Sequence, residues 1–385
     1  MKRLSIKPRE KWQDTVSNLG LTYHSDDNKP YWDESVCYSF EESEIAYIEK
    51  SANRLHQLCL EAVDYIIAKK CYDKFNLPES AISLIESSWQ ADKFYLYGRF
   101  DFLYDQNNRL KLLEYNADTP TALYEASVVQ WQWLSECYPE QDQFNFIHEQ
   151  LILQWKKLKT HSHDMHFVCV TDSEEDLLTT EYLSDLFLQA KKTISNININ
   201  VLDVSSIGWN GYGFTDLNNH YIKMLFKLYP WEWLVHEEFS QYIDLKTTQW
   251  IEPPWKMLLS NKALLPILWK LFPGHENLLP AYDSLSEAVH KNGNNKIVKK
   301  PIFGREGANI SIIDPSSNKI ILEEPGPYDK DGFIYQHYCS CNYEEYYPIL
   351  GVWMVGDVAA GMGVRESNQA ITTNMSRFVP HYSKV

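Results

Sequence analysis

The chain has 385 residues, a formal net charge of −16, 44% hydrophobic residues and 14% aromatic residues. This size and composition exclude a disordered chain, and they predict one large domain or two to three closely joined ones. The negative charge disfavours nucleic acid and anionic membranes as partners. It would attract cations, polyamines among them, although solubility alone is a sufficient reason for it.

The N-terminal sequence MKRLSIKP has no apolar core of signal-peptide length, and no run of about 18 apolar residues occurs in the chain. The seven cysteines are odd in number and mostly scattered, which predicts reduced thiols and a cytoplasmic location. Cys339 and Cys341 are close together. No second Cys/His pair stands at zinc spacing, so we interpret these two cysteines as structural.

Hydrophobic periodicity predicts a mixed α/β (α+β) chain with antiparallel strands near its end. The elements expected in chain order are a helix over 42–70, strands within 93–116, a helix over 121–137, a strand over 166–170, a helix over 181–192, a strand over 197–204 and a helical stretch over 253–271. From residue 297 onward we expect mostly strands, with turns at 314–318 and 356–357.

The densest set of polar side chains lies in the two strands expected within 93–116. Asparagine tolerates left-handed backbone angles, so a two-residue hairpin turn is expected at 107–108. The register that follows pairs Asp101 with Glu114 and Arg99 with Asn116, and it places all four side chains on one face. The opposite face is apolar and anchors the hairpin; it consists of Phe100, Phe102, Leu113 and Tyr115.

Two carboxylates and an amide oxygen on one face form a hard-oxygen site that suits Mg²⁺. Without a cation the two acids would repel each other, which is a further reason for a metal. Arg99 beside them would hold a phosphate or a developing oxyanion. A surface ladder of Arg, Asp and Glu ion pairs explains the same pattern, and the residues alone leave both interpretations open.

A second group of candidate residues is spread over the rest of the chain. Thr119 before Pro120 fits a helix N-cap, where a substrate carboxylate would bind, although plain capping explains it equally. Lys262 and Lys300 also stand out. The loop 303–309 carries two glycines, and its backbone N–H groups would wrap phosphates while a lysine supplies charge. Its spacing is not that of a Walker A loop.

Two C-terminal segments also allow two interpretations each. The segment Phe333–Tyr338 would be either a strand lining an adenine pocket or an ordinary aromatic core strand. Arg365, at a strand end before small polar residues, fits a phosphate-facing loop or a solvated one.

Several of these motifs occur in the order seen in one known family. Those that carry the resemblance are GRFD at 98–101, LEYNADTP at 113–120, the helical segment 255–262, the loop 300–309 and VRES at 364–367. Together they resemble the synthetase domain of the glutathionylspermidine synthetase family, from about Phe94 to Phe378. The metal ligands precede the lysines, an order that supports this family among ATP-grasp enzymes.

The resemblance implies an ATP-grasp fold, with mixed and antiparallel sheets and a flexible glycine-containing lid hairpin. It implies Mg²⁺ as a cofactor, bound by Asp101, Glu114 and Asn116. The residues it places at ATP are Arg99, Phe100, Asp101, Lys262, Lys300, Glu306, Gly307, Tyr335, Gln336, His337, Tyr338, Ala370, Ile371 and Thr372. The residues it places at the acid substrate are Thr119, Glu175, Arg305 and Arg365, and it makes Arg99 and Arg365 catalytic.

We therefore expect residues 1–385 to form a single synthetase unit without the family's cysteine amidase domain. Its expected parts are a helical N-terminal part over roughly 1–90, a metal and acid-substrate part over 91–250 and an ATP-binding lid and C-terminal part over 251–385.

The expected activity is that of an ATP-dependent acid–amine ligase, which forms a carbon–nitrogen bond through an acyl phosphate. Its substrates would be a small acid and a small amine, such as a peptide-like acid and a polyamine; glutathione and spermidine themselves are not carried over. The alternatives are an ATP-grasp kinase or phosphotransferase, and a nucleotide-binding protein without turnover.

Overall fold

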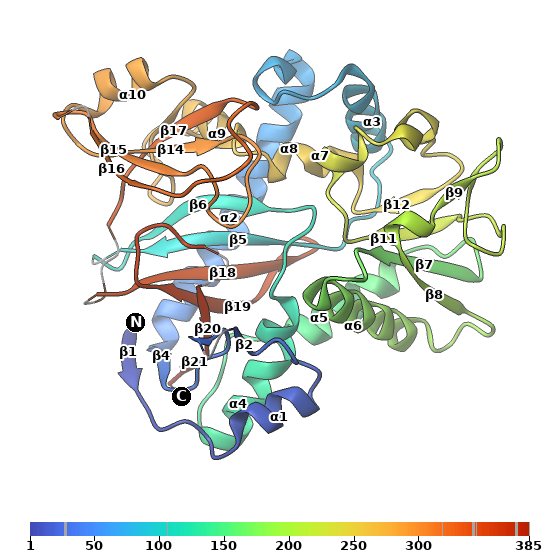
Figure 1. Ribbon diagram of the computed structural model, residues 1–385, viewed down its shortest axis with the longest axis horizontal. Coiled ribbons are helices and arrows are strands. Elements are labelled where there is room, and N and C mark those ends of the chain that lie inside the picture. The colour runs from blue at the N-terminus through green and yellow to red at the C-terminus, as the bar shows by residue number, and fades with distance from the viewer. Residues whose placement is uncertain are drawn as a thin grey trace.

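The computed structural model describes residues 1–26, 29–105, 107–317, 319–340, 343, 345–373 and 376–384. Helices flank three larger sheets, so the mixed α/β class expected from the sequence is confirmed (Figure 1). None of the helices in these ranges is long and apolar enough to cross a membrane. The six cysteines within them are free thiols, and Cys341 lies outside them.

The central sheet is antiparallel and has the strand order β20-β19-β18-β5-β6. Its strands are β5 (Tyr97–Tyr104), β6 (Leu110–Asn116), β18 (Tyr347–Val355), β19 (Val358–Ser367) and β20 (Arg377–Val379). The predicted turn between β18 and β19 is confirmed, and Gly356 has a φ of 56° there, in the left-handed region that glycine adopts without strain. This arrangement joins the predicted polar hairpin to the C-terminal strands.

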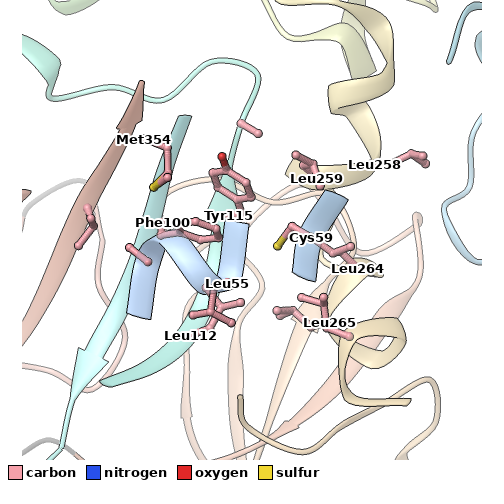
Figure 2. Close-up of a cluster of buried hydrophobic side chains, with 14 of the residues drawn as sticks. Leu55, Cys59, Phe100, Leu112, Tyr115, Leu258, Leu259, Leu264, Leu265 and Met354 are labelled. Atoms are coloured by element: carbon pink, nitrogen blue, oxygen red, sulfur yellow. The ribbon is translucent and has the colours of Figure 1, made fainter. Parts of the chain in front are cut away.

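One face of the central sheet is covered by the long helix α2 (Glu42–Lys69), which matches the prediction over 42–70. Figure 2 shows Leu55 and Cys59 of this helix next to Phe100 and Tyr115 of the sheet. The leucine-rich helices α8 (Met257–Ser260) and α9 (Leu264–Leu271) pack on the other side of α2. Burial of this apolar face leaves the opposite face of the sheet for polar residues.

A second antiparallel sheet, of order β13-β17-β14-β15-β16, lies above the central sheet in Figure 1. Its strands are β13 (Ala281–Tyr282), β14 (Ile297–Pro301), β15 (Ser311–Asp314), β16 (Lys319–Glu323) and β17 (Phe333–His337), and α10 (Leu285–Asn292) packs against β17 and β13. Strands were predicted for this region. Asn318, in the predicted turn over 314–318, lies outside the described residues.

The third sheet is parallel and has the order β12-β11-β7-β8. Its strands are β7 (Asp164–Cys169), β8 (Asn198–Asp203), β11 (Met224–Lys227) and β12 (Gln249–Ile251). Helix α6 (Glu174–Lys191) packs against β7 and β8, and α5 (Ile147–Lys157) packs on α6. The predicted strands and helix are confirmed here, but the helix begins seven residues earlier than expected, where Ser173 accepts a hydrogen bond from the Asp176 amide.

The first 90 residues are only partly helical, which corrects the expectation for this part. This part contains the helices α2 and α3 (Glu79–Gln90), as expected. However, β1 (Lys2–Ser5) and β4 (Val36–Phe40) form a small sheet with β21 (His381–Ser383). Pairing with the C-terminal strand favours the strand conformation of β4, and local sequence patterns do not reveal a partner that is so remote in sequence. The shorter elements are α1 (Trp12–Asn18), β2 (Ser25–Asp26), β3 (Lys29–Pro30), α4 (Gln130–Cys137), β9 (Gly208–Trp209), β10 (Phe214–Thr215) and α7 (Trp231–Leu234).

Candidate functional site

The hairpin of β5 and β6 has the predicted register at the polar residues, although its turn is not the two-residue turn that was predicted. Arg99 pairs with Asn116 and Asp101 with Glu114, as expected. Nearer the turn the register shifts by one residue, because the connection is longer than two residues: the Asp105 amide donates to the Arg109 carbonyl. A bulge at Leu113 compensates for this shift.

The bulge reverses one assignment on the apolar face. Leu113 lines the polar cleft, and Leu112 is buried in the core in its place. The bulge also turns the Leu113 carbonyl toward Lys300, whose Nζ donates to it at 3.0 Å. The other three residues predicted on that face, Phe100, Phe102 and Tyr115, are buried in the core as expected.

Arg99 and Asp101 form the first half of the polar face. The Arg99 guanidinium binds both carboxylate oxygens of Asp101, at 2.6 and 2.9 Å, and also donates to the Thr121 carbonyl at 2.5 Å. Burial raises the pKa of Asp101, against the attraction of Arg99. A Cβ at position 351 would stand 2.9 Å from Cδ of Arg99, so Gly351 makes the room in which this arginine lies.

Glu114 forms the second half of the face, together with two lysines from other elements. Lys262, between α8 and α9, has its Nζ 3.0 Å from Oε2 of Glu114, and Lys300 at the end of β14 lies nearby. Burial alone would raise the pKa of Glu114, but the two ammonium groups outweigh it and lower this pKa to about 2. Burial lowers the pKa of Lys300 to about 8, although Glu114 favours its charged form.

The three predicted metal ligands converge. Nδ2 of Asn116 lies 3.2 Å from Oδ2 of Asp101 and 3.1 Å from Oε1 of Glu114. An amide flip would turn its oxygen toward the same point, because amide oxygen and nitrogen differ only by rotation of the group. The donor set of two carboxylates and one amide suits Mg²⁺. Within the described ranges no group of three or more His, Cys, Asp or Glu residues has metal-binding geometry.

These groups line a cleft of about 230 Å³ between the central sheet and the β13–β17 sheet. The predicted residues that line it are Arg99, Asp101, Glu114, Asn116, Thr119, Lys262, Lys300, Arg305, Glu306, Gly307, Gln336, His337, Tyr338, Arg365, Ala370, Ile371 and Thr372. Chain segments far apart in the sequence therefore meet at one place.

Three predicted site residues do not line the cleft. Phe100 is fully buried and stacks on Tyr115 with 3.8 Å between the ring centroids, because it lies on the α2 face of the sheet. Tyr335 is also absent from the cleft, unlike its neighbour Gln336. Glu175, in the first turn of α6, accepts a hydrogen bond at 3.2 Å from the amide of Ala122, a lining residue, and so supports the cleft from behind.

The expected helix start at Thr119 and Pro120 is wrong. The helix begins at Leu123, after Ala122 with a φ of 63°, and residues 119–122 form a loop. Thr119 therefore caps no helix; its hydroxyl accepts a hydrogen bond from Arg305 at 2.7 Å. Asp118, the preceding residue, accounts for this conformation, because its buried carboxylate binds Lys227 at 2.6 Å and holds the loop to β11.

The glycine loop 303–309 lies over the cleft in contact with both sides of it. The Gly304 carbonyl accepts a hydrogen bond from Lys262 at 2.8 Å. Gly307 has a φ of 75°, and a Cβ there would stand 2.3 Å from the Thr372 carbonyl oxygen. Glycine is required at this position because both the backbone angle and the close approach exclude a side chain.

Arg365, on β19, also lines the cleft. It donates to the Ser376 carbonyl at 2.8 Å and to the Thr373 carbonyl at 3.3 Å, and its guanidinium carbon lies 5.8 Å from the centre of the Tyr31 ring. The Tyr31 hydroxyl donates at 2.7 Å to Glu125, whose carboxylate is fully buried. Burial, and next to it the charge of Glu175, raises the pKa of Glu125 to about 7.

Several of the residues that line the cleft were not predicted from the sequence, among them one acid and one tryptophan. Glu232 of α7 lines it, and Trp353 of β18 packs near Arg99. Neither residue stands in a pattern that indicates a site, because each reaches the cleft only through the packing of remote elements.

The chain is similar in sequence to proteins that are named as ligases and synthetases. A protein of Haemophilus influenzae named "Putative acid–amine ligase" is 44% identical over 99% of both chains. The trypanothione synthetase of Crithidia fasciculata is 27% identical over 83% of this chain and 52% of its own length. The bifunctional glutathionylspermidine synthetase/amidase of Escherichia coli is 25% identical over 89% of this chain and 58% of its own length. The chain thus spans little more than half of these two longer relatives.

A solved structure shares the fold at low sequence identity. A glutathione synthetase-like effector of Globodera pallida has a TM-score of 0.56 and 11% identity, and the match covers 90% of this chain and 88% of that one. The family model described as glutathionylspermidine synthase preATP-grasp matches residues 3–384. The chain therefore belongs to the glutathionylspermidine synthase family.

Proposed function

We propose that the protein is an ATP-dependent ligase that joins a carboxylic acid to an amine through an acyl phosphate. The observation that carries this is the convergence of Asp101, Glu114 and Asn116 with three cationic side chains in one cleft. Carboxylates that hold a metal and cations that hold phosphates are the parts that phosphoryl transfer requires. The names of the relatives support the ligase class and small-molecule substrates.

We propose further that the fold is an ATP-grasp fold in which the nucleotide lies between the central sheet and the β13–β17 sheet. The loop 303–309 would be the lid, because it already contacts Lys262 and Thr372. His337 lines this cleft, and its Nε2 is buried without a hydrogen-bond partner in the described chain, so this atom is suited to bind a polar group of the nucleotide. The chain would form one synthetase unit, in which 91–250 supplies the metal ligands and part of the acid site. Residues 251–385 would supply the lid, most of the ATP site and the two arginines of the acid site; a cytoplasmic location stays a prediction.

The residues present fit Mg²⁺, which Asp101, Glu114 and Asn116 would hold and which supplies positive charge to the phosphates when bound. Arg99, Lys262 and Lys300 would then exchange their present partners for phosphate oxygens. Each of these cations already lies within hydrogen-bond distance of an acceptor in the cleft, so only short side-chain movements are required. Arg99 would neutralise the charge that develops on the transferred phosphoryl group.

The covalent steps follow from this placement. A carboxylate oxygen of the acid attacks the γ-phosphorus of ATP, the bond to the bridging oxygen breaks and ADP leaves. The amine then attacks the acyl carbon, the bond to the phosphate oxygen breaks, and phosphate and a proton are released. Arg365 and Arg305 would orient the acid, and the lid would exclude water that would otherwise hydrolyse the acyl phosphate.

Trapping with hydroxylamine tests this proposal directly. The protein is incubated with ATP, Mg²⁺, a panel of peptide and amino-acid carboxylates and hydroxylamine, which is expected to yield the hydroxamate of the true acid with one ADP per product. Asp101→Asn serves as the inactive control. A phosphate ester on a hydroxyl group of the substrate, which does not react with hydroxylamine, would fit the kinase alternative. Nucleotide binding without a hydroxamate for any acid would contradict the ligase assignment.

A further inference from the structure

Arg305, in the middle of the glycine loop, is held by three side chains that belong to other parts of the fold. Its Nη2 lies 2.7 Å from the Thr119 hydroxyl and 3.3 Å from a carboxylate oxygen of Glu232. Its guanidinium carbon stands 5.0 Å from the centre of the Trp233 ring, within the range of a cation–π interaction. The loop is thus attached through one side chain to the side of the cleft opposite its own sheet.

The positions of these three side chains depend on one buried ion pair. Asp118 binds the Lys227 ammonium at 2.6 Å through one oxygen and the Trp231 amide at 2.7 Å through the other. Thr119 follows Asp118 directly, and the helix α7 that starts at Trp231 continues with Glu232 and Trp233. A single carboxylate therefore fixes the loop and the helix that meet Arg305.

We propose that Glu232 and Trp233 are positioning residues that, with Thr119, dock Arg305 and so hold the glycine lid closed over the cleft. This inference rests on the proposed function, which places Arg305 at the acid substrate. Closure of the lid and assembly of the acid site are then one event, because the arginine that closes the lid is also the one that faces the acid. Nε of Arg305 is buried without a hydrogen-bond partner in the described chain, which leaves a donor for an acid carboxylate.

The closed dock should protect the Arg305–Glu306 peptide bond from an arginine-specific protease, because the protease must take the Arg305 side chain into its own pocket. Cleavage of a transiently opened segment follows the population of the open form. Loss of a partly exposed ion pair and a cation–π contact should raise that population by roughly tenfold. The initial rate at which a new N-terminus at Glu306 appears, measured by mass spectrometry, reports this change.

The variants are Glu232→Gln, Trp233→Leu and the double variant, each with a conservative or matched control. Trp233→Phe keeps an aromatic face under the guanidinium and should restore most of the protection. Glu238→Gln and Trp131→Leu, which alter an exposed acid and an exposed tryptophan elsewhere, should leave the rate unchanged. Thermal unfolding followed by circular dichroism establishes that each variant is folded.

Faster cleavage in the double variant with rescue by phenylalanine supports the dock. An unchanged rate, or equal acceleration in the two controls, overturns it, as does a wild-type protein that is cleaved at Arg305 as fast as the double variant. Binding of a fluorescent ATP analogue with Mg²⁺ is measured on the same samples. A wild-type protein that binds no nucleotide would count against the proposed function, whereas nucleotide binding with an unchanged cleavage rate would count against the dock alone.

Discussion

Replacing Lys262 by methionine is expected to have opposite effects on the two ligands of the cleft. In the ligand-free protein Lys262 neutralises Glu114, a proposed metal ligand, across 3.0 Å. Divalent metal must displace this ammonium before it can bind the carboxylate. The triphosphate, in contrast, needs the ammonium. Lys262→Met should therefore strengthen metal binding in the absence of nucleotide and weaken nucleotide binding in the presence of metal.

The magnitude follows from the geometry of the pair. At an effective dielectric constant of about 20, two unit charges at this separation attract each other by roughly 5 kcal/mol. The side chains are 5% and 26% exposed, and the desolvation of both offsets most of this attraction. A net effect of about 1–2 kcal/mol remains, which corresponds to a change of about 5- to 30-fold in each dissociation constant.

Two titrations measure these constants. Free Mn²⁺ is followed by electron paramagnetic resonance without nucleotide, and a non-hydrolysable ATP analogue is titrated by calorimetry with Mg²⁺ present. Lys270→Met, which removes an exposed lysine outside the cleft, controls for the general loss of one positive charge. If Lys262→Met bound Mn²⁺ no more tightly than the Lys270 variant, the proposed exchange of partners at Glu114 would be refuted.

Three further predictions concern the sheet and its surroundings. Gly351→Ala should reduce nucleotide affinity by about tenfold with little change in unfolding temperature, because the new methyl group displaces Arg99. Calorimetry measures the affinity and thermal melts measure the unfolding temperature. An unchanged affinity would contradict this role of the glycine. Leu55→Ala, in the core of Figure 2, should lower the free energy of unfolding by about 2–5 kcal/mol in urea titrations, and a loss below about 1 kcal/mol would show that the site is loosely packed. In the folded protein the pKa of Glu125 is raised to about 7. Between the ordinary pKa of a glutamate and pH 7, the folded protein therefore binds more protons at this residue than the unfolded protein does. The stability of the wild type should fall as pH rises through that window. Glu125→Gln should remove this part of the pH dependence, and parallel curves for variant and wild type would count against the buried, protonated state.

In the polar hairpin, the local sequence pattern determines which side chains share a face, and tertiary contacts determine the turn and the bulge. Alternation along β5 and β6 was enough to place Arg99, Asp101, Glu114 and Asn116 on one face, because side chains in strands alternate whatever the surroundings. The turn was predicted one residue too short, and the bulge at Leu113 was not foreseen. The bulge offsets the longer turn, and contacts with remote chain segments hold it. One such contact is the hydrogen bond that the Leu112 amide donates to the Asn277 carbonyl.

The failures at Thr119 and at the N-terminus have the same cause. Thr119-Pro120 carries a helix-start signal, yet the helix begins only at Leu123, because the buried ion pair between Asp118 and Lys227 holds the preceding loop to β11. Strand β4 owes its conformation to its partners β1 and β21, the latter at the other end of the chain. Local propensity amounts to tenths of a kilocalorie per residue, and a buried ion pair or a sheet partner outweighs it.

By itself, the sequence determined the α/β class, the long helix α2 and the polar face of the hairpin, since hydrophobic periodicity and strand alternation are local properties. Only the tertiary structure decided that Tyr335 and Glu175 lie outside the cleft, and that Glu232 and Trp233 reach Arg305. Such placements arise where elements distant in the chain pack together. The burial of apolar surface drives this packing, and because it is non-directional, the sequence pattern alone does not show which distant segments will meet.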